Sequence, residues 1–450
     1  MTVDLSQFLS REATLRKGSV MVGAKGDDLI SLSLGLPSPA CFPLKGITLD
    51  VQSPKSNFQQ TETISRTIET HPDEIIESCQ YMSSSGLKYF NQWIKQYVTD
   101  YFLPGYSEWD FIIQAGGTQS LDAIFRMLID PGEDTALCET LTYPCFLETC
   151  VPLRIKTISI EMDENGIVPS KLEETLQNWN INETTKNLKK PKLIYLMPTG
   201  HNPTGITLSI ERRRRIVELA SIHNFLIVED DPYYHLQLDE NEHIPSLLKF
   251  DTEGRVIRID SFSKMLMPGL RVSIVTANKL FIKKLSMHNE LSIHSAAASS
   301  QLILQMIFSN WGETGFKDWL SHLQDLYRRR RDVLLNAFKK FIPHDLVTYN
   351  EPNYGMFLWI NVNLDQFKKP QGSSLSDSKW ATKVEDSVYN AALKCNVVLT
   401  KGHWFMHHKT MKIAGFRATY AFVDEDKMIK AAELLGKAIK NSYELLCNEK

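Results

Sequence analysis

The chain has 450 residues, of which 43 % are hydrophobic and 23 % are charged, a composition typical of globular proteins. This excludes a disordered chain, a collagen and a coiled coil, and at roughly 150 residues per domain the length predicts two or three domains. The net charge of −3, from 50 basic and 53 acidic residues, provides no basic field for binding nucleic acid.

Seven cysteines are spread along the chain without a CxxC pair, and their odd number argues against a disulfide framework. Free thiols are typical of a reducing compartment. The sequence contains no run of 18 apolar residues, and its first residues lack the apolar stretch of a signal peptide. We therefore expect a cytoplasmic protein with no membrane partner and no metal site.

Short apolar runs alternate with helical patterns through the first two thirds of the chain. In chain order, the strand-like and helical segments are 111–113, 121–129, 192–197, 210–223, 225–228 and 256–259. Short apolar runs between helices are typical of parallel strands that are buried on both faces. The pattern predicts an α/β fold with a three-layer α/β/α, mostly parallel sheet.

The last third of the chain has a different character. Long helical patterns over 316–341, 380–394 and 424–446 surround a strand-like segment, 355–362. This indicates a smaller α+β domain. We expect a large domain over residues 51–319 and a small domain built from residues 1–50 and 320–450, with the boundary near residues 310–325.

Polar motifs follow four of the predicted strands. They are Gly116-Gly117-Thr118-Gln119, Gly200–Gly205 (GHNPTG), Glu229–Tyr234 (EDDPYY) and Ser261-Phe262-Ser263-Lys264. The carboxyl ends of parallel strands are where ligands bind in open α/β sheets. Each motif alone has an ordinary alternative, such as a βα turn or a surface loop, so their convergence on one sheet edge is the stronger signal.

The Ser261-x-x-Lys264 segment allows two kinds of chemistry. Ser261 could be the nucleophile of an acyl enzyme, but the S-D-N and K-T-G elements that such a site needs do not follow. Alternatively, Lys264 is an amine in a crowded cleft, with a lowered pKa that suits a Schiff base. A surface lysine is the ordinary alternative. Arg271, seven residues later, adds a fixed positive charge.

Several segments resemble those of a known family and occur in the same order along the chain. They are Ile30–Pro43 (ISLSLGLPSPACFP), Gln80–Gly86, Gly116–Leu121, Asn202–Gly205, Glu229–Tyr234, Asp260–Arg271 (DSFSKMLMPGLR), Gly355–Ile360 and Phe416-Arg417. In these the chain resembles the fold-type I aminotransferases that depend on pyridoxal 5′-phosphate (PLP). It is most similar to the aromatic and 2-aminoadipate/kynurenine aminotransferase subgroup.

The resemblance implies how the cofactor is held. Lys264 falls on the Schiff-base lysine, and Asp230 falls on the carboxylate that pairs with the pyridine nitrogen of PLP. Tyr233 and Asn202 would donate hydrogen bonds to the phenolic oxygen, although an Asn-Pro pair is also an ordinary turn signal. Tyr143 matches the aromatic ring that stacks on the cofactor.

The cofactor phosphate is a dianion that needs several donors. The family pattern assigns them to Gly117, Thr118, Ser261, Ser263 and Arg271. Relatives often have Ser-Gln where this chain has Gly117-Thr118, so at Gly117 only a backbone contact can remain. Tyr81 matches a tyrosine that reaches the phosphate of a neighbouring subunit, which implies a homodimer, whereas a core tyrosine is the ordinary alternative.

The substrate is expected to be held by Arg417, which matches the arginine that binds the α-carboxylate with two parallel bonds. Gly35 and Asn202 would lie beside that carboxylate. The subgroup accepts aromatic and long acidic side chains, and Arg16 or Lys17 lies near where relatives place an N-terminal arginine. We expect transfer from aromatic donors, with 2-aminoadipate as a second donor, to 2-oxoglutarate or another 2-oxo acid in ping-pong order.

Two alternatives remain at this point. One is another fold-type I PLP enzyme, such as a lyase, decarboxylase or synthase, because a fold does not fix the reaction. The other is an aminotransferase-like regulatory domain without catalysis. Such regulators need an N-terminal winged-helix module of about 70 residues, and only 34 residues precede Gly35.

Overall fold

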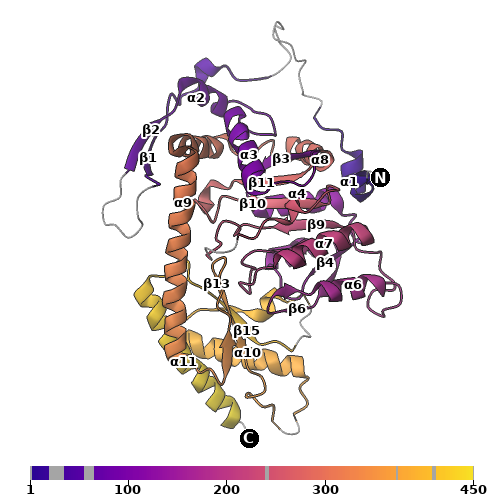
Figure 1. The fold of residues 1–450 in the computed structure, drawn as a ribbon, viewed down its shortest axis with the longest axis vertical. Coiled ribbons are helices and arrows are strands. Elements are labelled where there is room, and N and C mark those ends of the chain that lie inside the picture. Colours follow the sequence, from indigo (N-terminus) through magenta and orange to yellow (C-terminus); the bar gives the residue numbers. More distant parts are fainter. Residues whose placement is uncertain are drawn as a thin grey trace.

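The computed structural model describes residues 3–19, 35–54, 65–238, 243–370, 373–407 and 412–448. A large and a small sheet are joined by a long helix, α9 (Ala298–Phe341) (Figure 1). The large sheet has the order β3-β11-β10-β9-β8-β4-β5. Its strands are β3 (Trp109–Gln114), β4 (Thr135–Glu139), β5 (Lys156–Ile160), β8 (Leu193–Leu196), β9 (Leu226–Asp230), β10 (Val256–Ser261) and β11 (Ser273–Asn278).

The large sheet is mostly parallel, as the sequence predicts. Strands β10, β9, β8, β4 and β5 pair in parallel, whereas β11 runs antiparallel to both of its neighbours. Helices α4 and α8 contact β3 and β11, while α6 contacts β5 and α7 contacts β9. The helices of this part are α2 (Pro72–Cys79), α3 (Lys88–Tyr101), α4 (Gly117–Leu128), α5 (Pro144–Cys150), α6 (Pro169–Gln177), α7 (Ile210–His223) and α8 (Lys279–Glu290).

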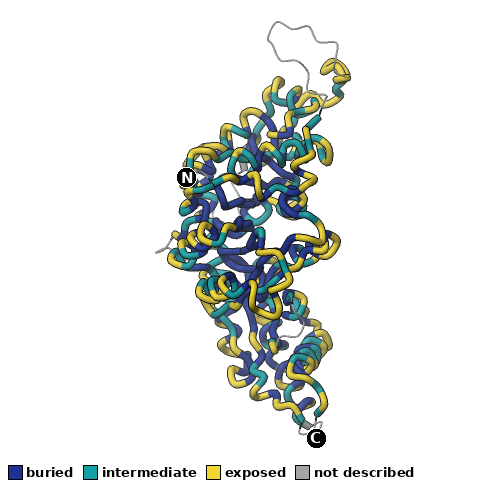
Figure 2. The backbone as a smooth tube through the Cα atoms, turned by 90° about the vertical axis from the view of Figure 1, so that its right-hand side faces the viewer, coloured by how far each residue is buried: buried dark blue, intermediate teal, exposed yellow. Residues whose placement is uncertain are grey.

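The central strands of the large sheet form the middle of the core. Every residue of β8, β9 and β10 is buried. In Figure 2 the buried residues, coloured dark blue, run through the centre of the molecule. In the parallel register, Leu196 lies opposite Glu229, and Asp230 lies opposite Ile259. The carboxyl ends of these strands therefore share one edge, which confirms the predicted convergence of polar motifs.

The small sheet is antiparallel, with the order β12-β13-β15-β14. Helix α11 contacts both α9 and α10 beside it. The predicted helix over 316–341 is the second part of α9, and non-helical backbone at Gly312 (φ 64°, ψ −173°) separates it from a first helical part that begins at Ala298. The other elements are β12 (Val347–Tyr349), β13 (Phe357–Val362), α10 (Asp377–Lys394), β14 (Thr400–Lys401), the 3₁₀ turn η5 (Gly402–Phe405), β15 (Gly415–Thr419) and α11 (Glu425–Asn448).

The N-terminal segment lies against the large domain. It forms the 3₁₀ turn η1 (Leu5–Phe8) and α1 (Arg11–Leu15), and the Ser10 backbone N–H donates to the Met127 carbonyl at 2.8 Å. The sequence groups residues 1–50 with the small domain, whereas residues 3–19 contact α4 and α8 of the large domain. We propose that this segment belongs to the large domain and that the boundary lies within α9.

Two short hairpins complete the described chain. Strands β1 (Thr48–Gln52) and β2 (Ser65–Glu69) pair antiparallel, and the Trp311 indole N–H of α9 donates to the Gln52 carbonyl at 3.3 Å. Strands β6 (Met162–Asp163) and β7 (Gly166–Ile167) form the second hairpin. Neither hairpin supplies a residue of the site described below.

Candidate active site

Arg417 of the small sheet meets the carboxyl edge of the large sheet. Its Nη1 donates to Oδ1 of Asn202 at 2.7 Å, and its Nη2 donates to the Thr400 hydroxyl at 3.3 Å. The guanidinium carbon lies 4.5 Å from the ring centre of Phe357 and 5.2 Å from that of Phe405. A cation held between aromatic rings at a domain junction is suited to binding a carboxylate that carries an apolar side chain.

Lys264 follows β10 at the same edge and is half-buried. No hydrogen bond or ion pair joins its amine to another residue within the described ranges. Burial lowers the pKa of Lys264, and the positive charges of Arg417 and Arg271 lower it further. A lowered pKa leaves more of the amine neutral near pH 7, as a nucleophile or base requires.

The start of α4 forms an anion cradle with Arg271. Gly116 precedes the helix with φ 92°, and a Cβ at this position would clash with Nη2 of Arg271. The guanidinium therefore lies directly on this glycine, beside the free N–H groups that begin the helix. Its hydrogen bond within the described chain is to the Pro268 carbonyl, at 3.2 Å. This arrangement fits a phosphate group.

Asp230 ends β9 beneath the same edge. Its Oδ2 accepts a hydrogen bond from the Tyr195 hydroxyl at 2.6 Å. Burial raises the pKa of Asp230 to about 7, the Tyr195 hydrogen bond lowers it, and the neighbouring Asp231 raises it again. Such a carboxyl can carry a negative charge at neutral pH when a cationic partner, such as a protonated pyridine ring, is present.

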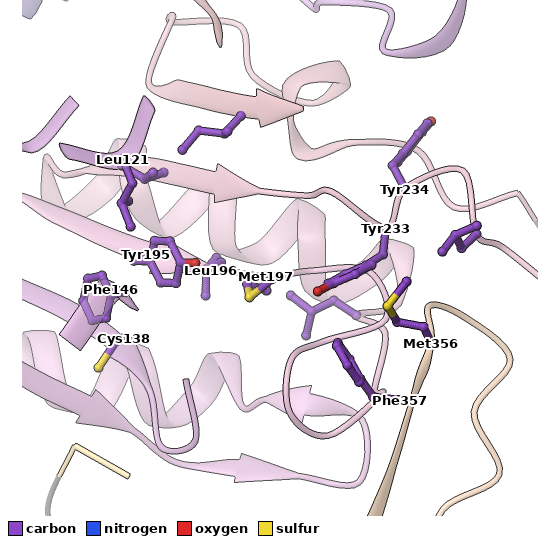
Figure 3. Close-up of a cluster of buried hydrophobic side chains, with 14 of the residues drawn as sticks. Leu121, Cys138, Phe146, Tyr195, Leu196, Met197, Tyr233, Tyr234, Met356 and Phe357 are labelled. Carbon is purple, nitrogen blue, oxygen red and sulfur yellow. The ribbon is translucent and has the colours of Figure 1, made fainter. Parts of the chain in front are cut away.

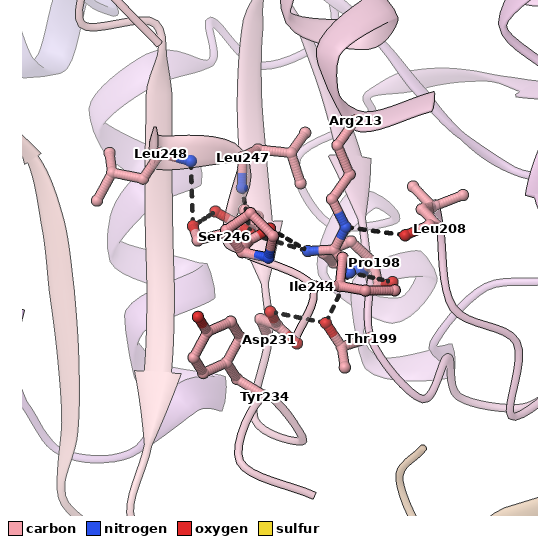
Figure 4. A network of polar contacts seen from close by, with 12 residues as sticks. Pro198, Thr199, Leu208, Arg213, Asp231, Tyr234, Ile244, Ser246, Leu247 and Leu248 are labelled. Carbon is pink, nitrogen blue, oxygen red and sulfur yellow. Dashed lines mark hydrogen bonds and ion pairs between the residues drawn. The ribbon is translucent and has the colours of Figure 1, made fainter. Parts of the chain in front are cut away.

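Asp230 differs from the two acidic residues beside it in the chain. Because side chains alternate along a strand, Glu229 and Asp231 point to the other face of the sheet. There Nη1 of Arg258 lies 3.0 Å from a carboxylate oxygen of each. Arg213 joins this network through Thr199, whose hydroxyl donates to Asp231 at 3.1 Å (Figure 4). The neighbouring carboxylates are thus paired with Arg258 on one face of the sheet, whereas Asp230 lies on the other face.

The aromatic residues predicted from the sequence also gather here. The Tyr233 ring packs edge-on against Phe357, with 5.4 Å between ring centres. Burial raises the pKa of Tyr143 well above its usual value, and Cys145 and Asp230 act in the same direction. Ser261 is buried, and its hydroxyl accepts the Ser263 backbone N–H at 3.2 Å. Thr118 lies exposed in the first turn of α4.

Other predicted residues lie outside this cluster. Tyr81 is 66 % exposed, and its ring contacts His294 edge-on at 5.2 Å. Gly35 is exposed and begins a described segment, since residues 30–34 of the matching motif lie outside the described residues. Arg16 forms an ion pair with Glu12 of α1, and Lys17 is exposed. The roles predicted for these residues stay predictions.

The sequence reasoning missed three contributors, Tyr195, Phe405 and Glu385. Glu385 is a buried residue of α10 that accepts the backbone N–H groups of Gly402 at 3.0 Å and Gly415 at 3.2 Å. It also pairs with His403, so it fixes the turn that carries Phe405. A glutamate within an amphipathic helix gives no signal in one sequence, and neither does a tyrosine within an apolar run.

The comparison with family models decides what this arrangement is. The model for aminotransferase class I and II matches residues 48–435. The chain belongs to this family.

Several known aminotransferases are similar to this chain over almost its whole length. An aromatic amino acid aminotransferase of Schizosaccharomyces pombe is 33 % identical, with 98 % of each chain covered. The mitochondrial kynurenine/alpha-aminoadipate aminotransferase of Bos taurus is 30 % identical, with 96 % of each covered. The crystal structure of aminotransferase Aro8 from Candida albicans is 31 % identical, with a TM-score of 0.89 over 99 % of both chains.

The family fixes the cofactor and the reaction class. The cofactor is PLP, and a kynurenine aminotransferase from Pyrococcus horikoshii, 25 % identical with a TM-score of 0.70 over 97 % of this chain and 98 % of that one, was solved in complex with PMP. The Arg271 cradle and Asp230 fit the phosphate and the pyridine nitrogen of this group. The protein is a transaminase, whose substrates are amino acids and 2-oxo acids.

Two further observations concern the described residues alone. None of the helices there combines the length and apolar character needed to cross a bilayer. Nor do the described side chains of His, Cys, Asp and Glu gather in a group of three or more that could hold a metal ion.

Proposed function

We propose that this aminotransferase takes the amino group of an aromatic amino acid and passes it to 2-oxoglutarate or another 2-oxo acid in ping-pong order. The observation that carries this is the position of Arg417 between Phe357 and Phe405. The guanidinium suits the α-carboxylate, and the two rings supply an apolar wall for an aromatic side chain. The aromatic substrates named for the S. pombe relative support the same choice.

The aminoadipate alternative requires a cation for the distal carboxylate. Of the two residues predicted for this role, Arg16 is ion-paired with Glu12 and Lys17 is exposed. We therefore rank 2-aminoadipate second, as a donor that the kynurenine/alpha-aminoadipate relative makes worth testing.

The proposed roles of the side chains follow from their positions. When bound, PLP supplies an aldehyde for the amino group and a ring that accepts electrons. The Nζ of Lys264 would take the proton from the substrate Cα and deliver it to C4′ of the cofactor, which its lowered pKa and flexible stem favour. Arg417 fixes the α-carboxylate, so that the Cα–H bond points toward that amine. Gly35 is proposed to lie beside the same carboxylate.

The remaining side chains are proposed to hold the cofactor. Asp230 pairs with the pyridine nitrogen, while Tyr233 and Asn202 bind the phenolic oxygen. Tyr143, at the start of α5, stacks on the ring. The donors proposed for the phosphate are Gly117, Thr118, Ser261, Ser263 and Arg271.

We also propose a homodimer in which Tyr81 reaches the phosphate of the neighbouring subunit. The 66 % exposure of this large aromatic side chain supports a partner, because exposed aromatic residues are enriched at interfaces. Sedimentation would give the mass of one chain if this were wrong. A cytoplasmic location is a further proposal, supported by the seven free cysteines.

A donor and acceptor screen tests the substrate proposal. The PLP-loaded protein is mixed with phenylalanine, tyrosine, tryptophan, kynurenine, 2-aminoadipate, aspartate or alanine, and 2-oxoglutarate is the acceptor. We expect the aromatic donors to have the highest kcat/KM. A preference for aspartate or alanine would contradict the role given to the Phe357 and Phe405 rings.

A further inference from the structure

Tyr195 is a buried tyrosine of β8 whose hydroxyl reaches the end of the neighbouring strand. It lies opposite Val228 of β9 in the parallel register. Since side chains two residues apart on a strand share a face, Tyr195 and Asp230 lie on the same side of the sheet. The Tyr195 ring also stacks on Phe146 of α5, with 4.4 Å between centres and 10° between planes (Figure 3). This packing leaves the phenol little freedom to turn away.

Among the described residues, the Tyr195 hydroxyl is the one group that donates a hydrogen bond to the Asp230 carboxylate. The Tyr195 hydroxyl donates to Oδ2 at 2.6 Å, and no described group donates to Oδ1. Glu229 and Asp231 have the Arg258 guanidinium instead. One oxygen of Asp230 is therefore fixed by the phenol, while the other accepts no hydrogen bond from the described residues.

We propose that Tyr195 is a positioning residue, whose hydroxyl fixes the orientation of Asp230 and keeps its carboxylate charged for the pyridine nitrogen of PLP. This inference rests on the proposed role of Asp230. It goes beyond that role because it assigns the control of Asp230 to a residue that does not touch substrate or cofactor. Figure 3 shows the Tyr195 and Tyr233 hydroxyls pointing toward each other from two sides of the site.

Near neutral pH, the hydrogen bond from Tyr195 helps to set whether Asp230 is protonated. The pKa of Asp230 is raised to about 7 by burial, against the effect of Tyr195. The other titratable or charged groups that act on Asp230 are Asp231, Arg258, Asp260, Tyr143 and Tyr233. Without the phenol, the carboxyl would hold its proton to higher pH, and a neutral carboxyl cannot pair with a protonated pyridine ring.

The test compares Tyr195→Phe with a matched control, Tyr97→Phe. Tyr97 of α3 is equally buried, and its hydroxyl also donates to a carboxylate at 2.6 Å, that of Asp260. Both variants delete one buried phenol oxygen and retain the ring. A purely structural loss would affect the thermal stability of both, whereas the proposal predicts a change in cofactor binding for Tyr195→Phe alone.

The dissociation constant of PLP is measured from pH 6 to pH 9 for wild type and both variants, by absorbance and by tryptophan fluorescence. We expect Tyr195→Phe to move the midpoint of the pH dependence upward by about one unit, so that binding near pH 7 weakens up to about tenfold. The deficit should disappear at pH 9, where Asp230 is ionised in either protein. Tyr97→Phe should stay within twofold of wild type.

Equal pH midpoints for wild type and Tyr195→Phe would overturn the inference, and so would an equal shift in Tyr97→Phe. Failure of the proposed function is distinguished by Asp230→Asn: if that variant binds PLP like wild type, the role of Asp230 itself is wrong. If Tyr195→Phe does not fold, 3-fluorotyrosine at position 195 replaces it. Its more acidic phenol donates a stronger hydrogen bond, so the midpoint should move to lower pH, and an unchanged midpoint would overturn the inference.

Discussion

The two halves of the candidate active site are built in different ways. In the large domain, Asp230 is the last residue of β9 and Lys264 follows the adjacent parallel strand β10, so a buried sheet brings the two residues to one edge. In the small domain, Arg417 lies on an antiparallel sheet and is fixed by hydrogen bonds to Asn202 and Thr400. The difference supports the proposal that the large domain carries the groups that act on the cofactor and that the small domain orients the substrate against them.

Replacing Lys264, which belongs to the large-domain half, should have the largest effect on the catalytic rate. In Lys264→Ala, the amine proposed to move the substrate proton is gone, and we expect kcat to fall by at least about 10³-fold. Single-turnover absorbance measurements with an aromatic donor check this, with a thermal melt as control for folding. Residual turnover within tenfold of wild type would show that another group carries the proton.

Glu385→Ala should have the next largest effect, on the small-domain half. The substitution leaves the buried N–H groups of Gly402 and Gly415 without their acceptor. We expect a loss of about 2–4 kcal/mol in the free energy of unfolding and a raised KM for aromatic donors. Denaturant unfolding and steady-state kinetics measure the two changes.

A neighbouring acid on the same helix provides the control. Asp386 pairs with Lys401 at 2.6 Å but its side chain is 44 % exposed. Asp386→Ala should therefore cost no more than about 1 kcal/mol. Similar losses in the two variants would contradict the special role of Glu385 in fixing the Phe405 turn.

Arg417→Lys should separate substrate binding from cofactor binding. Lysine keeps the charge but cannot form two parallel bonds to a carboxylate. We expect kcat/KM for aromatic donors to fall by about 10–100-fold, mainly through KM, and the dissociation constant of PLP to change much less, through the lost contact with Asn202. Arg271→Lys is the contrasting variant, which should weaken PLP binding instead. If the two variants behaved alike, the comparison between the two halves would fail.

The smallest expected effect is on the stability of the cofactor-free protein at different pH. The pKa of Asp230 is about 7 in the folded chain against an ordinary value of 3.8. Between these values the folded state retains a proton that the unfolded state has lost, so this contribution to stability falls as pH rises from about 4 to 7.

A comparison with Asp230→Asn isolates this contribution. Raising the pH from 5.5 to 7.5 should lower the Tm of wild type by a few °C more than that of Asp230→Asn. Parallel changes in the two melting curves would mean that Asp230 is ionised at both pH values.

The large-domain half was the more predictable from sequence. Runs such as 225–228 stand out because strands buried on both faces are continuously apolar, and the polar residues that follow them mark the ligand edge. Strands β4, β5 and β11 were missed. The mixed composition of β5 (KTISI) and β11 (SIVTAN) hides them between stronger patterns.

The contacts that position the site residues could not be read from the sequence. Whether Tyr195 reaches Asp230 depends on the register of β8 against β9, and a shift of one residue would turn the phenol to the other face. Glu385 acts on residues 17 and 30 positions away through a turn whose path only the fold defines. The resemblance to a family named Lys264, Asp230 and Arg417, but not the residues that hold them.

The central claim is that Lys264 is the residue to which PLP is joined. The most direct measurement is borohydride reduction of the PLP-loaded protein, followed by proteolysis and mass spectrometry of the peptides. We expect one pyridoxyl group per chain, attached to Nζ of Lys264 and absent from the Lys264→Ala variant. A pyridoxyl group on another lysine, or none on any peptide, would contradict the account.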